Sequence, residues 1–142
     1  MRVLVDTSIW SLSLRRRSKD LAPKETILRD ELMELVAEGR ALLIGPIRQE
    51  ILSGIRNEAQ YGRLRDILRW FSDEPLAASD YELAAKLSNQ CRATGIVGSP
   101  ADFLLCAVAT GRNCPIFTSD GDFKTFGGVF PIRLHGPRPV NR

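Results

Sequence analysis

The first ten residues, MRVLVDTSIW, constrain the fold more than any other stretch of the chain. The uninterrupted apolar run over residues 3–5 is typical of a strand that is buried on both faces, as strands of parallel sheets are. The run ends at Asp6, and two hydroxyl side chains, Thr7 and Ser8, follow it. Because open α/β sheets bind ligands at the carboxyl ends of their strands, this position of Asp6 predicts a functional site.

Apolar runs and helical periods alternate along the rest of the chain. After the first strand, the patterns predict further strands at 41–44, 114–118 and 129–134, with a short one at 76–78, and helices at 7–14, 24–38, 46–55, 61–71, 79–94 and 100–110. Residues 123–128 are expected to be irregular. Strands that alternate with helices indicate βαβ units, so we expect an α/β fold with a mainly parallel sheet, in one domain over residues 1–136 with a flexible tail at 137–142.

Composition and charge exclude several classes of protein. No stretch approaches the ~20 apolar residues of a membrane span, and the N-terminus lacks the apolar segment of a signal peptide. The three cysteines, Cys91, Cys106 and Cys114, have spacings that fit neither a zinc site nor a disulfide framework, so we expect a reducing, cytoplasmic location. A net charge of +3 is compatible with a nucleic-acid partner but does not establish one.

A local excess of positive charge follows the first strand. It consists of Arg15, Arg16, Arg17 and Lys19. These side chains are either candidate contacts to an RNA backbone or the solvated end of a helix, and the sequence leaves both interpretations open.

Acidic side chains recur beside the predicted strands. Asp6 follows the first strand, Glu50 lies one turn into the helix after the second, Asp102 opens the apolar helix, and Asp120 follows the strand CPIFT with Asp122 beside it. Each has an ordinary structural explanation as well: a helix cap, a solvated helix residue, a capping box or a turn. Because strand ends and the starts of the following helices share one edge of a parallel sheet, all of them can reach a common cleft.

Carboxylates that crowd together repel one another and raise one another's pKa, and a hard divalent cation bound between them removes that repulsion. Mg²⁺ and Mn²⁺ prefer carboxylate and water oxygens, and such a site can activate a water against a phosphodiester. The single histidine, His135, weakens any mechanism that needs a histidine base, and the chain has no Gly-rich phosphate loop.

The motifs VLVDTSIW, PIRQEILSG, PADFLLCAVA and FTSDGDF together resemble the PIN domain, and in particular the small VapC-type toxins of bacterial toxin–antitoxin pairs. The resemblance implies a Mg²⁺- or Mn²⁺-dependent endoribonuclease on a three-layer α/β/α sandwich. By position it assigns the catalytic, metal-binding role to Asp6, Glu50, Asp102 and Asp120, and a supporting role to Thr7 or Ser8 and to Asp122. Asp120 is favoured over Asp122 as the direct ligand.

The resemblance also implies partners. RNA is the expected substrate, a cognate antitoxin would lie in a groove near the acids, and a homodimer is expected. Leu32, Leu35, Trp70 and Phe71 could line that groove or belong to the core, and Trp10 could pack beneath the site or at a dimer interface.

Two other functions fit parts of the sequence. In a phosphatase of the haloacid dehalogenase type a strand also ends in Asp, but a second Asp is needed at the position that Ser8 occupies. A non-catalytic RNA-binding or partner-binding module could keep the fold, although it would have no need of four acids.

Overall fold

The computed structural model describes residues 1–139 and has an α/β fold built on a three-stranded parallel sheet. The central strand is β1 (Val3–Val5), which pairs on one side with β2 (Ala41–Leu42) and on the other with β3 (Ile116–Phe117). Leu4 lies opposite both Leu42 and Ile116. All three residues of β1 are completely buried, which confirms that the apolar run is a strand covered on both faces.

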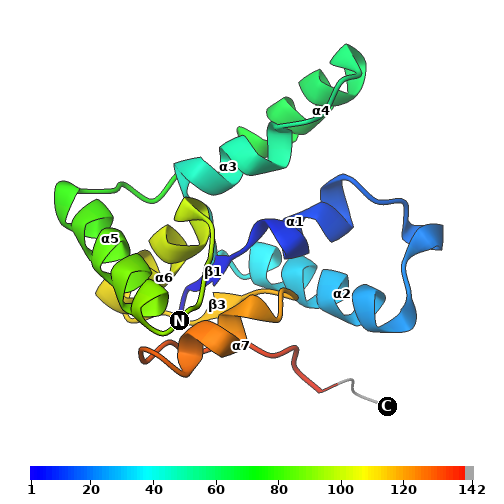
Figure 1. Cartoon of the computed structure of the whole chain (residues 1–142). Helices are drawn as coiled ribbons and strands as arrows, with labels where there is room; N and C mark the ends of the chain where they lie inside the picture. The colour runs from blue at the N-terminus through cyan, green and yellow to red at the C-terminus, as the bar shows by residue number, and fades with distance from the viewer. Residues whose placement is uncertain (140–142) are drawn as a thin grey trace.

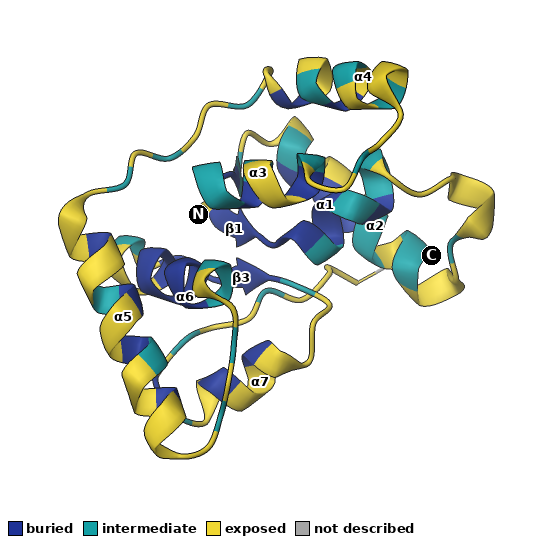
Figure 2. Ribbon diagram, turned by 45° about the horizontal axis from the view of Figure 1, so that its top comes forward, coloured by how far each residue is buried: buried dark blue, intermediate teal, exposed yellow. Residues whose placement is uncertain are grey.

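The helices lie in two layers, one on each face of the sheet. They are α1 (Thr7–Leu14), α2 (Pro23–Ala37), α3 (Gly45–Leu52), α4 (Glu58–Leu68), α5 (Ala78–Ala93), α6 (Pro100–Arg112) and α7 (Asp122–Gly127), with a short 3₁₀ helix, η1 (Ser18–Asp20), after α1. The strand order is β2-β1-β3, so the connection from β1 to β2 and the connection from β2 to β3 run in opposite directions across the sheet. Because both connections are expected to be right-handed, their helices lie on opposite faces of the sheet. Figure 2 shows α1, α2 and α3 on one side of β1 and β3, with α5, α6 and α7 on the other. The predicted three-layer α/β/α fold is confirmed.

Helix α4 stands apart from these layers. It follows α3 and projects from the body of the molecule (Figure 1). Arg48 of α3 holds the C-terminal end of α4. The Arg48 guanidinium donates hydrogen bonds to the backbone oxygens of Leu68 and Phe71 and forms an ion pair with Asp73 at 2.9 Å. None of the helices within residues 1–139 has the length and apolar character needed to span a membrane.

Three local predictions were wrong. Residues 76–78 form no strand, since Ala78 already begins α5. Residues 129–134 form only an isolated bridge, between Leu134 and Ile116, and Pro131 has no N–H with which to extend a ladder. Residues 122–127 form α7 rather than an irregular segment, because Phe123 and Phe126 lie three apart and both are buried.

The residues expected to line a partner groove lie in two different environments. Leu32 and Leu35 of α2 belong to the core, whereas the Trp70 side chain is 86% exposed. Trp10 is buried: its indole N–H donates to the Val5 carbonyl at 3.2 Å, and its ring packs edge-on against Phe71. Phe71 is partly buried and packs against the core, so the core interpretation holds for Leu32, Leu35 and Phe71 but not for Trp70.

The C-terminal segment is joined to α2 through Glu31. This carboxylate is 3% exposed and receives His135 Nε2 at 2.6 Å and Arg138 Nε at 2.7 Å. Burial acts to raise the pKa of Glu31, but the hydrogen bonds from Arg138 and His135 outweigh it and the pKa is lowered. The predicted flexible tail at 137–142 lies in part outside the described residues, since residues 140–142 are not described.

Candidate metal and catalytic site

Two hydroxyl groups hold the carboxylate of Asp6 at the end of β1. Ser8 Oγ donates to Asp6 Oδ2 at 2.9 Å, and Thr118 Oγ1 donates to the same oxygen at 2.8 Å. Each hydroxyl also accepts an N–H from the loop after β3: Ser8 from Ser119 at 3.1 Å, and Thr118 from Asp120 at 3.0 Å. The acid at the end of one strand is thus tied to the loop that follows the neighbouring strand.

Sequence reasoning gave Thr118 no role. The available signal was its place at the end of a buried strand, where Asp6 also stands on its own strand. Asp120 follows two residues later, and its Oδ1 accepts the backbone N–H of Asp122 at 2.9 Å. Asp122 therefore supports Asp120 through its backbone, in the first turn of α7.

Asp102 closes a capping box at the start of α6. Its N–H donates to Ser99 Oγ, and its Oδ2 accepts the Ser99 N–H, both at 3.2 Å. The sequence Ser-Pro-Ala-Asp predicts this cap, with Ser at the N-cap and Pro in the first turn. Because the cap uses only Oδ2, the structural role of Asp102 leaves its second oxygen available to the site.

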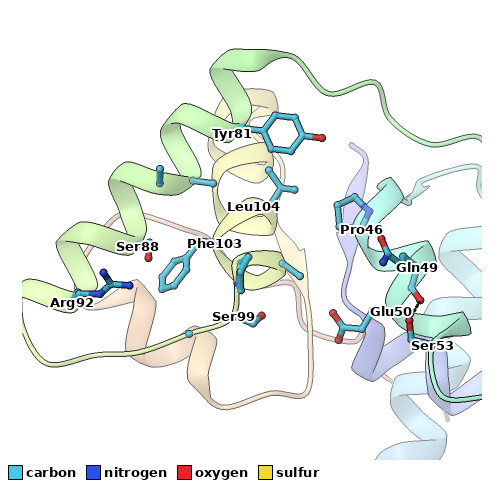
Figure 3. Close-up of a pocket in the computed structure, with 15 residues that line it drawn as sticks. Pro46, Gln49, Glu50, Ser53, Tyr81, Ser88, Arg92, Ser99, Phe103 and Leu104 are labelled. Carbon is cyan, nitrogen blue, oxygen red and sulfur yellow. Dashed lines mark hydrogen bonds between the residues drawn. The ribbon is translucent and has the colours of Figure 1, made fainter.

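Glu50 approaches from the opposite layer, on the second turn of α3. Figure 3 shows its carboxylate pointing across a groove toward Ser99 at the start of α6. Thr7 lies close enough to Glu50 to lower its pKa somewhat, yet Thr7 Oγ1 is buried and has no hydrogen-bond partner within residues 1–139. A buried hydroxyl without a partner costs free energy, so this atom is a candidate to contact a ligand or a water.

The charges of these acids act on one another. Burial raises the pKa of Glu50, and the negative charges of Asp6 and Asp102 raise it further. Burial also raises the pKa of Asp102, with Asp6 and Asp120 adding to the shift. The structure therefore brings Asp6, Glu50, Asp102 and Asp120 close enough for their negative charges to interact, at the carboxyl edge of the sheet.

The donor chemistry of this group fits a hydrated divalent cation. No three His, Cys, Asp or Glu side chains among the described residues lie close enough together to enclose a metal ion directly. Mg²⁺ commonly retains several waters and takes only one or two carboxylates directly. Mutual repulsion, raised pKa values and the unpaired hydroxyl of Thr7 would all be relieved by such an ion.

The basic cluster is not brought to the acids. Arg15, Arg17 and Lys19 lie at and beyond the far end of α1, which starts at the site and extends about 12 Å from it at 1.5 Å per residue. Arg16 is paired with Glu25 at 2.8 Å and donates to the Asp20 carbonyl at 3.0 Å. Any contact of this cluster with a ligand would therefore be made at a distance from the carboxylates.

A groove of about 820 Å³ opens beside the acids, between α3, α5 and the start of α6 (Figure 3). Glu50 lies on one wall, and Ser99 and Ala101 lie on the other, next to Asp102. The rest of the lining is largely apolar, with Tyr81 and Arg92 contributed by α5. A substrate or a partner segment that reaches the carboxylates has a concave approach on this side.

Comparisons with known proteins agree with this geometry. The model of the PIN domain family matches residues 3–129. Among solved structures, FitAcB from Neisseria gonorrhoeae is similar with a TM-score of 0.70 at 19% identity, over 95% of this chain and 97% of that one. FitAB bound to an IR36 DNA fragment is similar with a TM-score of 0.72 at 20% identity, over 99% of this chain and 98% of that one. VapBC2 from Rickettsia felis, bound to a DNA fragment from their promoter, is similar with a TM-score of 0.66 at 16% identity, over 95% of this chain and 98% of that one. A search of the curated proteins finds no match. At these identities the structural likeness establishes the fold.

Proposed function

The chain belongs to the PIN domain family, and we propose that it is a Mg²⁺- or Mn²⁺-dependent endoribonuclease, the toxin of a type II toxin–antitoxin pair. The observation that carries the proposal is the convergence of four carboxylates, from both helical layers and two strand ends, on one edge of the sheet. Its structural neighbours are VapBC and FitAB complexes, in agreement with a toxin of the VapC type.

Each acid has a role in the proposed mechanism. Asp6, Asp102 and Asp120 would hold the cation directly or through water, and a bound cation would supply an activated water and neutralise charge on the phosphodiester. Glu50 completes the set from the opposite helical layer, where its carboxylate would hold the cation or one of its waters. The Thr7 hydroxyl orients a water, and Ser8 and Thr118 fix the Asp6 carboxylate.

The partners follow from the same proposal. RNA would run past the carboxylates, with Arg15, Arg17 and Lys19 as backbone contacts, and Arg16 joining them if its pair with Glu25 opens. Replacing these residues should weaken binding to all sequences and flatten the salt dependence. We further propose a cytoplasmic homodimer that is neutralised by a cognate antitoxin.

RNA cleavage by the wild-type protein, with Mg²⁺ and with excess EDTA, tests the proposed activity. Asp6→Asn should lower the rate at least about 100-fold. Asp66→Asn, on the exposed surface of α4, is the matched control and should cleave normally. Full activity of Asp6→Asn, or of the wild type in EDTA, would exclude the mechanism. Growth arrest on induced expression, abolished by Asp6→Asn, tests toxicity.

Two alternatives make different predictions. A haloacid dehalogenase-type phosphatase would form a phosphoaspartate on Asp6, but Ser8 donates a hydrogen bond to Asp6 where that chemistry needs a second acid. A non-catalytic binding module would show no Mn²⁺ binding at millimolar concentration in calorimetry. The family match favours the nuclease over both.

A further inference from the structure

The loop between α5 and α6 makes an unusually close contact at Gly98. A Cβ built on this residue would lie 2.7 Å from Phe126 Cζ, and 3.0 and 3.1 Å from the Cζ and Cε2 atoms of Phe103. The backbone of Gly98 does not have a positive φ, unlike that of Gly95 at +78°. The requirement for glycine at position 98 is therefore steric, and it comes from the two aromatic rings rather than from the backbone conformation.

Those rings cannot move aside freely. Phe126 is completely buried and lies 5.1 Å from Phe103, 5.3 Å from Phe123 and 6.4 Å from Phe130, measured between ring centroids. Phe103 is 2% exposed. Since packed interiors tolerate added atoms poorly, a methyl group at position 98 would shift the loop, α7, or both.

Both of the segments in contact carry acids of the proposed site. Gly98 directly precedes Ser99, whose N–H and hydroxyl hold Asp102 through the capping box. Phe126 belongs to α7, and the Phe123 N–H in the first turn of that helix donates to the Asp120 carbonyl at 3.3 Å. The contact of Gly98 with Phe126 thus joins the loop that holds Asp102 to the helix that holds Asp120.

We propose that Gly98 is a positioning residue, whose missing Cβ lets the α5–α6 loop seat on Phe126 and so sets the separation of the Asp102 and Asp120 carboxylates. The inference rests on the proposed function, because it assigns the spacing a purpose in holding the cation. It adds a requirement that the acids alone do not contain: the loop before α6 and helix α7 must meet without a side chain between them.

Mn²⁺ binding measured by calorimetry, together with thermal unfolding, tests this role on the full chain. Gly98→Ala should weaken Mn²⁺ binding about tenfold or more at a temperature where the protein is folded. Gly98→Ala combined with Phe126→Leu removes Phe126 Cζ, the closest of the clashing ring atoms and the one below 3.0 Å, and should return the affinity to within about threefold of that of Phe126→Leu alone. Gly111→Ala, at the far end of α6 where the added Cβ would meet only Asp80 at 3.8 Å, is the control and should bind as the wild type does.

The outcomes separate the inference from the function on which it rests. Wild-type affinity in Gly98→Ala, or a loss that Phe126→Leu does not relieve, would overturn the positioning role and leave the nuclease proposal standing. If Gly98→Ala fails to fold, the double variant decides in the same way, because its Mn²⁺ affinity should match that of Phe126→Leu. A wild-type protein that neither binds Mn²⁺ nor cleaves RNA would overturn both.

Discussion

Replacing Glu50 by Gln is expected to stabilise the cation-free protein and to reduce its stabilisation by Mn²⁺. Burial raises the pKa of Glu50 above its usual 4.5, and the charges of Asp6 and Asp102 add to the shift. The unfolded chain therefore loses this proton at lower pH than the folded protein does. Stability from this group is lost as pH rises from 4.5 through the folded pKa, so at pH 7, above the unfolded pKa, Glu50 opposes folding, and glutamine removes that effect.

The magnitude of the gain is small, because Glu50 lies on the open wall of a groove, where burial is only partial and water screens its charge. We expect about 0.5 kcal/mol, which corresponds to about 2 °C in the midpoint of a chain of this size. Mn²⁺ at 100 times its dissociation constant should stabilise the wild type by about 2.7 kcal/mol, or about 10 °C. A tenfold loss of affinity in the variant would leave about 1.4 kcal/mol, or about 5 °C, at the same Mn²⁺ concentration.

Thermal unfolding followed by circular dichroism at pH 7, in EDTA and in Mn²⁺, measures both effects. The diagnostic result is a change of order: Glu50→Gln unfolds above the wild type in EDTA and below it in Mn²⁺. Glu82→Gln, an exposed substitution on α5 outside the groove lining, should follow the wild type in both. A variant that is less stable than the wild type in EDTA, or that gains as much from Mn²⁺, would refute the electrostatic reasoning.

Three further predictions concern the fold. Glu31→Gln should destabilise the protein by about 1–3 kcal/mol at pH 7, because the ion pair with Arg138 weakens. The pKa of Glu31 is lowered, so this stability is present above pH 4.5 and is lost as pH falls below it. The difference in unfolding free energy between the variant and the wild type, measured by urea titration, should therefore be smaller at pH 3 than at pH 7. Cys106, whose pKa burial raises to about 12, should react with a thiol reagent at pH 8 only as fast as the protein unfolds, as followed by absorbance. Trp10→Ala should cost about 3–5 kcal/mol in urea denaturation and Trp70→Ala less than about 0.5 kcal/mol, because only the first side chain is buried.

The sequence predicted the parts of the site that depend on short-range patterns. The buried run before Asp6 identified a central strand, and Ser-Pro-Ala-Asp identified the start of α6 together with its cap. Both signals lie within a few residues of the acid that they place. The rule that strand ends and helix starts share one edge of a parallel sheet then brought distant acids together without knowledge of any contact.

Features that depend on contacts between distant segments were missed. Thr118 is an ordinary hydroxyl in the sequence, and only the pairing of β1 with β3 places it against Asp6, 112 residues away. Gly98 reads as a loop glycine, and its steric role appears only when α7 packs beneath it. The expected strand at 129–134 failed for a different reason: its local apolar character predicted a strand, but the segment meets β3 only at the bridge between Leu134 and Ile116, and Pro131 has no N–H with which to extend the ladder.

The three aspartates of the proposed site have one arrangement in common, in which a structural role and the proposed cation-binding role do not compete. Asp6 uses Oδ2 for Ser8 and Thr118, Asp102 uses Oδ2 for the Ser99 amide, and Asp120 uses Oδ1 for the Asp122 amide. No described residue donates a hydrogen bond to the second oxygen of any of the three. Each carboxylate is thus fixed by one oxygen, which sets its orientation, while the other would be available to the proposed cation. If the proposed site is correct, the helix cap at Asp102 and the turn at Asp120 orient these carboxylates toward the cation, so the capping role supports the metal-binding role.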